Sequence, residues 1–158
     1  MTMLAQKRGR SKQDYGTPWS LIRSCGARFG TIVCDLAASA ANTKAPCWYG
    51  EDRDSLFVPW ALENPDGVLW LNPPFAQLAP WAAKCRAESA KRCGFLLLLT
   101  PASVGAKWFA EHVAGHAYVL GLRPRITFEG ATDPYPKDCT LSVFGHGLRG
   151  FDTWQWDG

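Results

Sequence analysis

Residues 68–75 read Val-Leu-Trp-Leu-Asn-Pro-Pro-Phe, an apolar run that ends in an amide, two prolines and an aromatic ring. Four consecutive apolar residues before a turn signal predict a buried strand. The side-chain carbonyl of Asn72 and the main-chain carbonyl of Pro73 are acceptors, and the two prolines fix the backbone that carries them. These residues favour a site for a planar amine, with Phe75 as a flat face beside it. A plain proline turn, with Phe75 in the core, fits the same residues.

Around this stretch, strands and helices alternate as they do in an open, mostly parallel α/β sheet. The run 95–100 is apolar on both faces, which predicts a central parallel strand. The strand-rich end of the chain predicts an antiparallel edge. The expected strands are 31–36, 68–71, 95–100, 117–120, 125–128 and 141–144, and the expected helices are 18–25 with Gly26 as the stop, 80–94 and 104–113.

The net charge of +3 over 158 residues is concentrated near the beginning of the chain. Lys7, Arg8, Arg10 and Lys12 precede the first acid, and the remaining 13 basic residues face 14 acidic ones. We expect residues 1–14 to be a flexible basic tail that contacts DNA phosphates, with a merely solubilising tail as the alternative. Residues 15–158 have the length of one domain with its own core.

Several other patterns limit the class of protein. The six cysteines form no C-x-x-C pair and no signal-peptide pattern precedes them, so we expect reduced thiols and a cytoplasmic location. No apolar run approaches the length of a membrane span. His112 and His116 lack further ligands at metal spacing, so no metal is expected. The phosphate-loop and nucleophile-elbow motifs are absent, which argues against common nucleotide hydrolases and serine hydrolases.

Three loops are candidates for ligand contacts. Small residues at 37–41 follow the strand that ends in Asp35, and they let a ligand approach the backbone, although an alanine-rich helix start explains them nearly as well. The acidic run 51–54 is either a solvated loop or the place where a carboxylate holds a ribose, as acids beyond a second strand do in nucleotide-binding sheets. The connection 129–138 is long for a hairpin, which is typical of functional loops.

The chain also carries a set of short motifs whose order is informative. They are Tyr15-x-Thr17-Pro18, Phe29-Gly30, Cys34-Asp35-Leu36-Ala37-Ala38-Ser39, Trp60, Asn72-Pro73-Pro74-Phe75, the strand Leu96 to Thr100 with Pro101, and Arg123-Pro124-Arg125-Ile126-Thr127-Phe128. In this order, and over about Tyr15 to Phe144, they resemble the phage-type Dam DNA N-6-adenine methyltransferase family. Asn-Pro-Pro-Phe by itself also occurs in methyltransferases that act on glutamine or RNA.

The resemblance implies a site-specific DNA adenine methyltransferase with a Rossmann-like sheet and S-adenosyl-L-methionine as cofactor. The catalytic residues that it implies are Asn72, Pro73, Pro74 and Phe75. The cofactor-binding residues are Tyr15, Thr17, Pro18, Asp35, Ala37, Ala38 and Ser39, with Glu51 or Asp54 on the ribose. The candidates for DNA contact are Lys7, Arg8, Arg10, Lys12, Trp108, Arg125, Tyr135 and Lys137.

The implied reaction is direct methyl transfer onto the amino group of a flipped-out adenine. A phage relationship suggests a part in restriction-modification and a location in the host cytoplasm, and we expect a monomer or homodimer. Two alternatives stay open. One is methyl transfer to RNA or a protein amide. The other is a catalytically degenerate DNA-binding protein, suggested by the basic tail and by Ala-Ala-Ser-Ala where many methyltransferases have a glycine-rich turn.

Overall fold

The structure is a computed structural model that describes residues 15–157. Lys7, Arg8, Arg10 and Lys12, with the rest of the predicted tail, lie outside the described residues. Within the described range, no helix has both the length and the apolar character needed to cross a membrane. The elements in chain order are α2 (Trp19–Phe29), β1 (Ile32–Asp35), β2 (Cys47–Trp48), η1 (Ser55–Phe57), α3 (Trp60–Glu63), β3 (Val68–Leu71), α4 (Ala79–Ser89), β4 (Leu96–Pro101), α5 (Lys107–His112), β5 (Tyr118–Arg123), β6 (Cys139–Phe144) and β7 (Gly150–Gln155).

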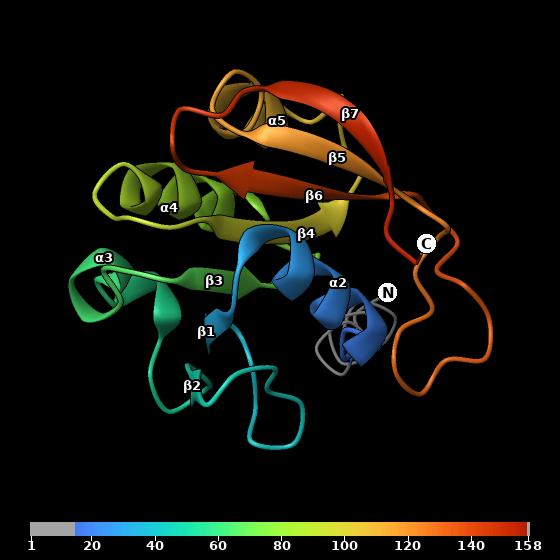
Figure 1. Cartoon of the computed structure of the whole chain (residues 1–158), viewed down its shortest axis with the longest axis horizontal. Helices are drawn as coiled ribbons and strands as arrows, with labels where there is room; N and C mark the ends of the chain where they lie inside the picture. Colours follow the sequence, from blue (N-terminus) through green and yellow to red (C-terminus); the bar gives the residue numbers. More distant parts are fainter. Residues whose placement is uncertain (1–14, 158) are drawn as a thin grey trace, which may run out of the picture.

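The strands form one sheet of seven in the order β2-β1-β3-β4-β6-β5-β7 (Figure 1). β2, β1, β3 and β4 are mutually parallel, and β5 pairs with β7 in parallel. β6 runs antiparallel to both of its neighbours, β4 and β5. The predicted α/β fold, with a mostly parallel sheet and an antiparallel part, is confirmed.

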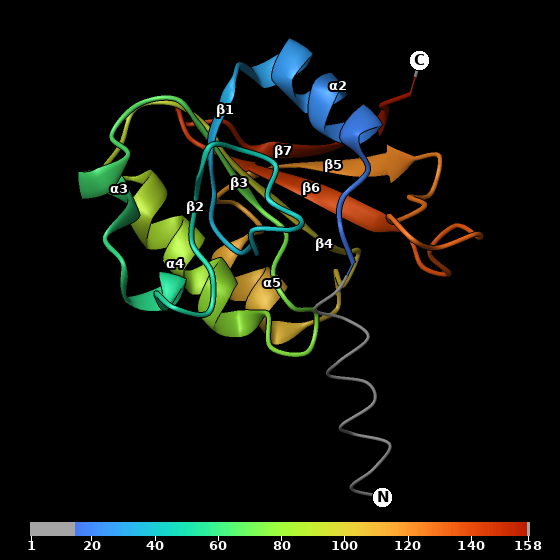
Figure 2. The same cartoon turned by 90° about the horizontal axis from the view of Figure 1, so that it is seen from below.

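Helices cover both faces of the sheet (Figure 2). α2 packs Leu21, Ile22 and Cys25 into the cluster on one face, whereas α4 and α5 pack against the other. Along β4, Leu97 and Leu99 belong to the first cluster, and Leu96 and Leu98 to the second. The apolar run therefore shows no alternation because both faces of the strand are buried, as predicted for a central strand.

The first helix is longer than predicted. It continues through Gly26 to Phe29, because the packing of Leu21, Ile22 and Cys25 in the core outweighs the modest cost of one glycine inside a helix. The helix ends at Gly30, whose φ of 115° is accessible mainly to glycine.

The strand predicted at 125–128 is wrong. Ile126 and Phe128 are buried and their neighbours are exposed, which gives a strand-like alternation, but the segment is irregular and joins no ladder. The prediction also missed the short edge strand β2 and the exposed edge strand β7, because neither has a continuous apolar pattern.

The expectation of reduced thiols throughout the chain is also corrected, because the structure joins Cys34 to Cys47 as a disulfide. These residues are register partners on the neighbouring parallel strands β1 and β2, with Cα atoms 4.5 Å apart. Their separation of 13 residues in sequence gives no sign of this pairing. Cys25, Cys85, Cys93 and Cys139 are free thiols.

The amino-terminal ends of β3 and β4 are joined by the guanidinium of Arg92. Its Nε donates to the Asn64 carbonyl, Nη1 to those of Gly94 and Phe95, and Nη2 to those of Asp66 and Gly67, at 2.7–3.1 Å. Gly94 has a φ of 91°, and a Cβ there would collide with the carbonyl of Gly67. All five N–H donors of one arginine thus hold two turns in direct contact.

Replacement of Arg92 by alanine should lower the free energy of unfolding by about 3 kcal/mol or more, because several partly buried carbonyls lose their donor. Chemical denaturation measures this change. Lys91→Ala, one position earlier and exposed, is the matched control and should stay within about 0.5 kcal/mol of the wild type. Equal stability of the two variants would contradict a clamping role for Arg92.

Candidate active site at the carboxyl ends of the central strands

Asn72 directly follows β3, at the carboxyl edge of the parallel part of the sheet. Its Nδ2 donates to the main-chain carbonyl of Tyr15 at 3.3 Å and to Oγ1 of Thr17 at 3.0 Å. A carbonyl oxygen can only accept, so these partners determine which side of the amide carries the nitrogen. Oδ1 of Asn72 therefore faces away from the Tyr15 carbonyl, and it has no hydrogen-bond partner within residues 15–157.

The rest of the Asn-Pro-Pro-Phe turn has features of both predictions, a binding site for a planar amine and a proline turn with Phe75 in the core. Pro73 is buried, and Phe75 is half-buried against the core. The ring of Phe75 meets Phe128 and Tyr135 edge-on, with centroids 6.3 and 5.9 Å away, while Tyr15 stacks on Phe128 at 5.5 Å. Phe75 is thus partly a core residue, but one side of it also lines a cavity.

That cavity has a volume of about 440 Å³ and lies between the turn after β3, the start of α4 and the loop before β6. Trp108, Tyr135 and Lys137, three of the residues predicted to contact DNA, line it together with Phe75. The structure adds Gln77 and Ser103, which the sequence analysis did not single out. The walls of this cavity therefore provide aromatic faces, an amide, a hydroxyl and one cation. The remaining lining residues are Ala76, Leu78, Ala79, Pro80 and Pro101.

Arg125, also predicted to contact DNA, does not line the cavity. Its Nε donates to Oδ1 of Asp138 at 2.9 Å, and both side chains are exposed. Because Tyr135 N also donates to the Ile126 carbonyl at 2.7 Å, the loop that carries Tyr135 and Lys137 is closed at its base. Arg125 thus holds the ends of this loop together at the molecular surface.

Asp35 ends β1 and organises the loop that follows it. Asp35 is 3% exposed, and its carboxylate accepts from the backbone N–H of Lys44 at 3.0 Å and of Ala37 at 3.3 Å. Burial raises the pKa of Asp35 from its usual 3.8 to about 6, and the two N–H donors and the charge of Lys44 offset only part of that effect. Ala37 and Ala38 of this loop are half-buried, and Ser39 is exposed.

The loop after β2 lies against the loop after β1. Ala38 N donates to the Tyr49 carbonyl at 2.9 Å, and a Cβ on Gly50 would come within 2.8 Å of the Ala38 carbonyl. Glu51 follows at the surface and has no side-chain partner within the described chain. Oδ1 of Asp54, in contrast, accepts from Leu56 N at 3.0 Å and caps η1. Of the two acids predicted for a ribose, Glu51 is therefore the one with both carboxylate oxygens unpartnered within the described residues, whereas one oxygen of Asp54 is engaged.

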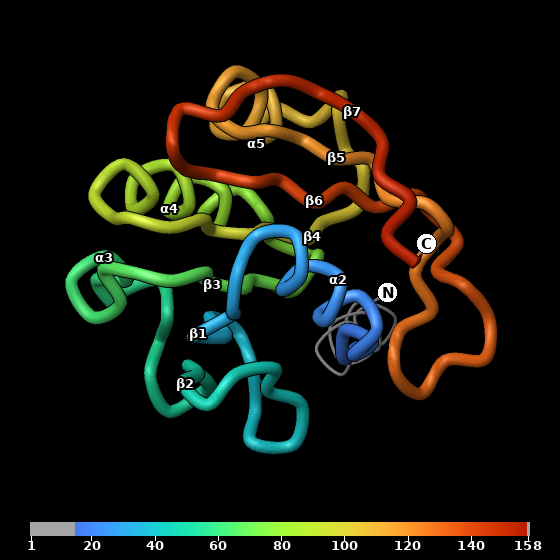
Figure 3. The backbone as a smooth tube through the Cα atoms, viewed as in Figure 1, coloured from blue at the N-terminus to red at the C-terminus, as the bar shows by residue number. Residues whose placement is uncertain are grey.

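An ion pair between a buried lysine and an exposed glutamate connects the two sides of this region. Lys44, whose side chain is 3% exposed, donates from Nζ to Oε1 of Glu129 at 2.6 Å. Glu129 N donates to the Gly16 carbonyl at 2.9 Å, which places the connection 124–138 beside the segment before α2 (Figure 3). Sequence reasoning missed Lys44 and Glu129, since a single lysine in a loop and a single acid 85 positions later carry no local signal.

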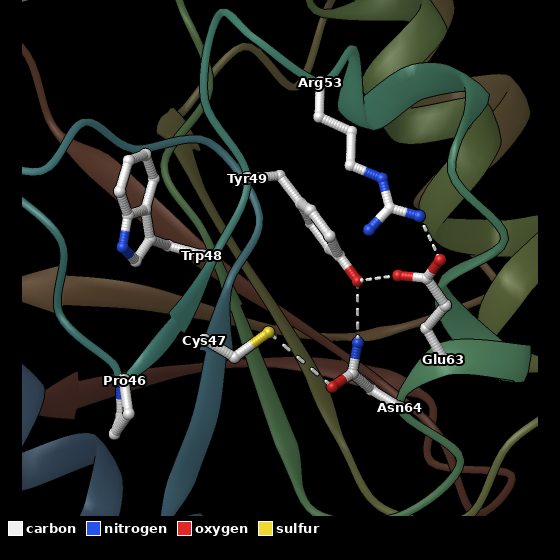
Figure 4. Close-up of a pocket in the computed structure, with 7 residues that line it drawn as sticks. All are labelled: Pro46, Cys47, Trp48, Tyr49, Arg53, Glu63 and Asn64. Carbon is white, nitrogen blue, oxygen red and sulfur yellow. Dashed lines mark hydrogen bonds and ion pairs between the residues drawn. The ribbon is translucent and has the colours of Figure 1, made fainter.

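A second cavity, of about 350 Å³, lies along the edge strand β2 (Figure 4). The Tyr49 hydroxyl donates to Glu63 at 2.5 Å and accepts from Nδ2 of Asn64 at 3.1 Å, and Arg53 pairs with the same Glu63. Trp48 points to the opposite side of the strand from Tyr49 (Figure 4). Because these polar groups already form hydrogen bonds with one another, they connect α3 to β2. Oδ1 of Asn72, the acceptor without a partner within residues 15–157, lies at the other end of β3.

Within residues 15–157 no group of three or more His, Cys, Asp or Glu side chains is arranged to hold a metal ion. The groups at the carboxyl edge are instead a free amide oxygen, aromatic faces and carboxylates. Such groups accept hydrogen bonds from an amine or a hydroxyl and stack on a planar ring.

A protein-family model described as "DNA N-6-adenine-methyltransferase (Dam)" matches residues 5–140, which is most of the chain. No curated protein matches the sequence.

The raised pKa of Asp35 predicts a pH dependence of stability. An acid with a higher pKa in the folded state binds its proton more tightly when folded, so its contribution to the free energy of unfolding falls as pH rises from about 4 to about 6. Asp35→Asn removes this titration. Between pH 4 and pH 7, the unfolding free energy of the wild type relative to this variant should therefore fall by up to about 3 kcal/mol.

Denaturant titrations across this pH range measure the effect. Asp52→Asn, which changes an exposed carboxylate of the next loop, should retain the wild-type pH dependence. A constant difference between wild type and Asp35→Asn at every pH would show that Asp35 does not titrate in this window.

Proposed function

Because the chain belongs to the DNA N-6-adenine-methyltransferase (Dam) family, we propose that it transfers a methyl group from S-adenosyl-L-methionine to the N6 amino group of adenine in DNA. The observation that carries the proposal is the orientation of Asn72. Its amide nitrogen is engaged by Tyr15 and Thr17, which leaves its oxygen as a free acceptor at the carboxyl edge of the sheet.

In the proposed reaction the adenine amino group donates one hydrogen bond to Oδ1 of Asn72 and one to the main-chain carbonyl of Pro73. Two acceptors in fixed positions hold the amine so that its nitrogen lone pair points away from both of them. Pro73 and Pro74 keep the acceptors in place because their φ angles are locked. Phe75 offers its exposed side to the base.

The residues at the carboxyl ends of β1 and β2 fit the cofactor by the chemistry of their donors and acceptors. The loop at 37–39 has small side chains, and Glu51 offers a free carboxylate of the kind that holds ribose hydroxyls in nucleotide-binding sheets. We assign Asp35 the role of shaping this loop, since its two oxygens already accept Ala37 N and Lys44 N. S-adenosyl-L-methionine supplies a methyl group already activated on a sulfonium, so the protein has mainly to bind and orient.

The cavity beside Phe75 is the proposed position for the target base and its flanking phosphate. Trp108 and Tyr135 supply stacking faces and Lys137 supplies a cation within one space of about 440 Å³. Adenine in a duplex must leave the base stack to reach such a site, at a cost of a few kcal/mol that stacking and phosphate contacts offset. The loop at 129–138 is proposed to contribute sequence selectivity.

Asn72→Ala should reduce methyl transfer to unmethylated DNA by at least about a hundredfold, because the amine loses a fixed acceptor. Incorporation of labelled methyl groups into adenine measures the rate, and calorimetry should show nearly unchanged cofactor binding. Asn64→Ala is the matched control, since it removes an amide at the opposite end of β3 and should retain activity. A wild-type protein that leaves adenine unlabelled at low and moderate salt would refute the proposed activity.

A panel of acceptors separates the alternative substrates. Duplex DNA, single-stranded DNA, RNA and a glutamine-containing peptide are incubated with labelled cofactor under the same conditions. Label in adenine of either form of DNA supports the proposal, whereas label confined to RNA or peptide would replace it. DNA binding without cofactor binding would instead indicate a degenerate enzyme.

Glu51→Gln should weaken cofactor binding by about tenfold or more, because the ribose hydroxyls lose a charged acceptor. Isothermal calorimetry measures the dissociation constant. Asp54→Asn is the control: asparagine also caps helices well, so this change should affect cofactor binding by less than about threefold. The reverse ranking of these variants would assign the ribose to Asp54.

A further inference from the structure

We propose that Thr17 is a positioning residue for the acceptor amide: its hydroxyl, together with the Tyr15 carbonyl, holds Nδ2 of Asn72 in place and makes no contact with the cofactor. The proposal rests on the proposed function for its catalytic consequence. It gives Thr17 a role different from the cofactor contact that the family resemblance implies.

The geometry at Thr17 is that of an internal support. The residue is 1% exposed, and within residues 15–157 its hydroxyl has the Asn72 amide as its side-chain partner, at 3.0 Å. The second proton of the same Nδ2 points at the carbonyl of Tyr15, at 3.3 Å. If the amide were rotated by half a turn, Oδ1 would face the Tyr15 carbonyl oxygen, and neither of these oxygens could donate. The Tyr15 carbonyl therefore sets the orientation of the amide, and the Thr17 hydroxyl anchors Nδ2 in that orientation.

This orientation matters because an amide has one accepting and one donating end. With Nδ2 toward Thr17, Asn72 presents an acceptor to the amino group of adenine, which can donate to it. The rotated amide would present N–H groups to an amine that also carries N–H groups, so no hydrogen bond to the amine hydrogens would form. Thr17 therefore affects the amino group of adenine only indirectly, by holding the Asn72 amide that binds it.

The segment that carries Thr17 is itself held from several sides. Tyr15 stacks on Phe128, and the Gly16 carbonyl accepts from Glu129 N. A Cβ on Gly16 would come within 2.5 Å of Oε2 of Glu129, so the side chain of Glu129 lies directly against Gly16. On the other side, Pro18 precedes α2, which is anchored in the core. The Thr17 hydroxyl is thus a fixed point.

The same contacts continue to the loop after β1. Glu129 pairs with the buried Nζ of Lys44, and Lys44 N donates to the carboxylate of Asp35. A chain of polar contacts therefore runs from the acceptor amide, through residues 15–17, to the loop proposed for the cofactor. Thr17 occupies the acceptor end of this chain, which favours an effect on the transfer step over an effect on cofactor affinity.

Thr17→Val tests the proposal, because valine keeps the shape of threonine and removes the acceptor. With saturating cofactor, kcat on DNA should fall by at least about tenfold, while the dissociation constant of S-adenosyl-L-methionine stays within about twofold. Thr17→Ser keeps a hydroxyl and should restore most of kcat. The matched control is Thr140→Val, which makes the same change at a buried threonine whose hydroxyl meets Thr100 in the core.

A spectroscopic measurement tests the contact independently of activity. The side-chain amide signals of Asn72, assigned by their loss in Asn72→Ala, should exchange slowly with solvent in the wild type. They should shift in Thr17→Val and return toward wild-type positions in Thr17→Ser. If the wild-type protein is inactive but shows these amide signals, the proposed function is refuted while the contact between Thr17 and Asn72 is still supported.

Any one of four results would overturn the proposal. One is a loss of cofactor affinity in Thr17→Val with kcat unchanged at saturation, which would make Thr17 a cofactor ligand. Another is an equal loss of activity in Thr140→Val. If Thr17→Val does not fold, rapid solvent exchange of the Asn72 amide in the wild type, or unshifted amide signals with reduced kcat in Thr17→Ser, would be enough.

Discussion

The guanidinium of Arg92 fixes the part of the molecule on which the site depends. Its five donors hold carbonyls from the turns before β3 and β4, and these two strands lie side by side at the centre of the parallel half of the sheet. Gly67 and Gly94 let the two turns touch. Since the strands are short and buried on both faces, fixing them at one end also determines where their other ends emerge. Asn72 and Pro101 are placed at those other ends.

At the carboxyl edge, polar contacts between distant segments replace regular structure. Asn72, Thr17, Glu129, Lys44 and Asp35 come from four separate segments of the chain, yet hydrogen bonds and backbone contacts link them in sequence. Most of these groups are buried, and a buried polar group without a hydrogen-bond partner is costly. Each contact in the network therefore stabilises the groups that form the neighbouring contacts. The network therefore fixes the Asn72 amide and the loop after β1, which the proposed function assigns to the amine and to the cofactor.

The sequence-based predictions succeeded where the physical signal is local. The strands at β1, β3 and β4 have apolar runs, and the Asn-Pro-Pro-Phe turn follows one of them, so both could be placed from the sequence. The strand predicted at 125–128 was wrong because Ile126 and Phe128 alternate for packing against Tyr15 and the core, without a neighbouring strand. The disulfide was missed since strand register, which no spacing of cysteines reveals, brings Cys34 beside Cys47.

The sequence by itself determined the class of fold and singled out the Asn-Pro-Pro-Phe turn as the proposed acceptor motif, because hydrophobic patterning and turn residues act over a few positions. It also supplied an ordered set of motifs, which the family match over residues 5–140 supports. Only the tertiary structure decided which way the Asn72 amide faces, which of Glu51 and Asp54 is free, and that Lys44 joins Glu129 beneath the loops. Those outcomes depend on contacts between residues far apart in the chain, and such contacts exist only once the sheet has brought the segments together.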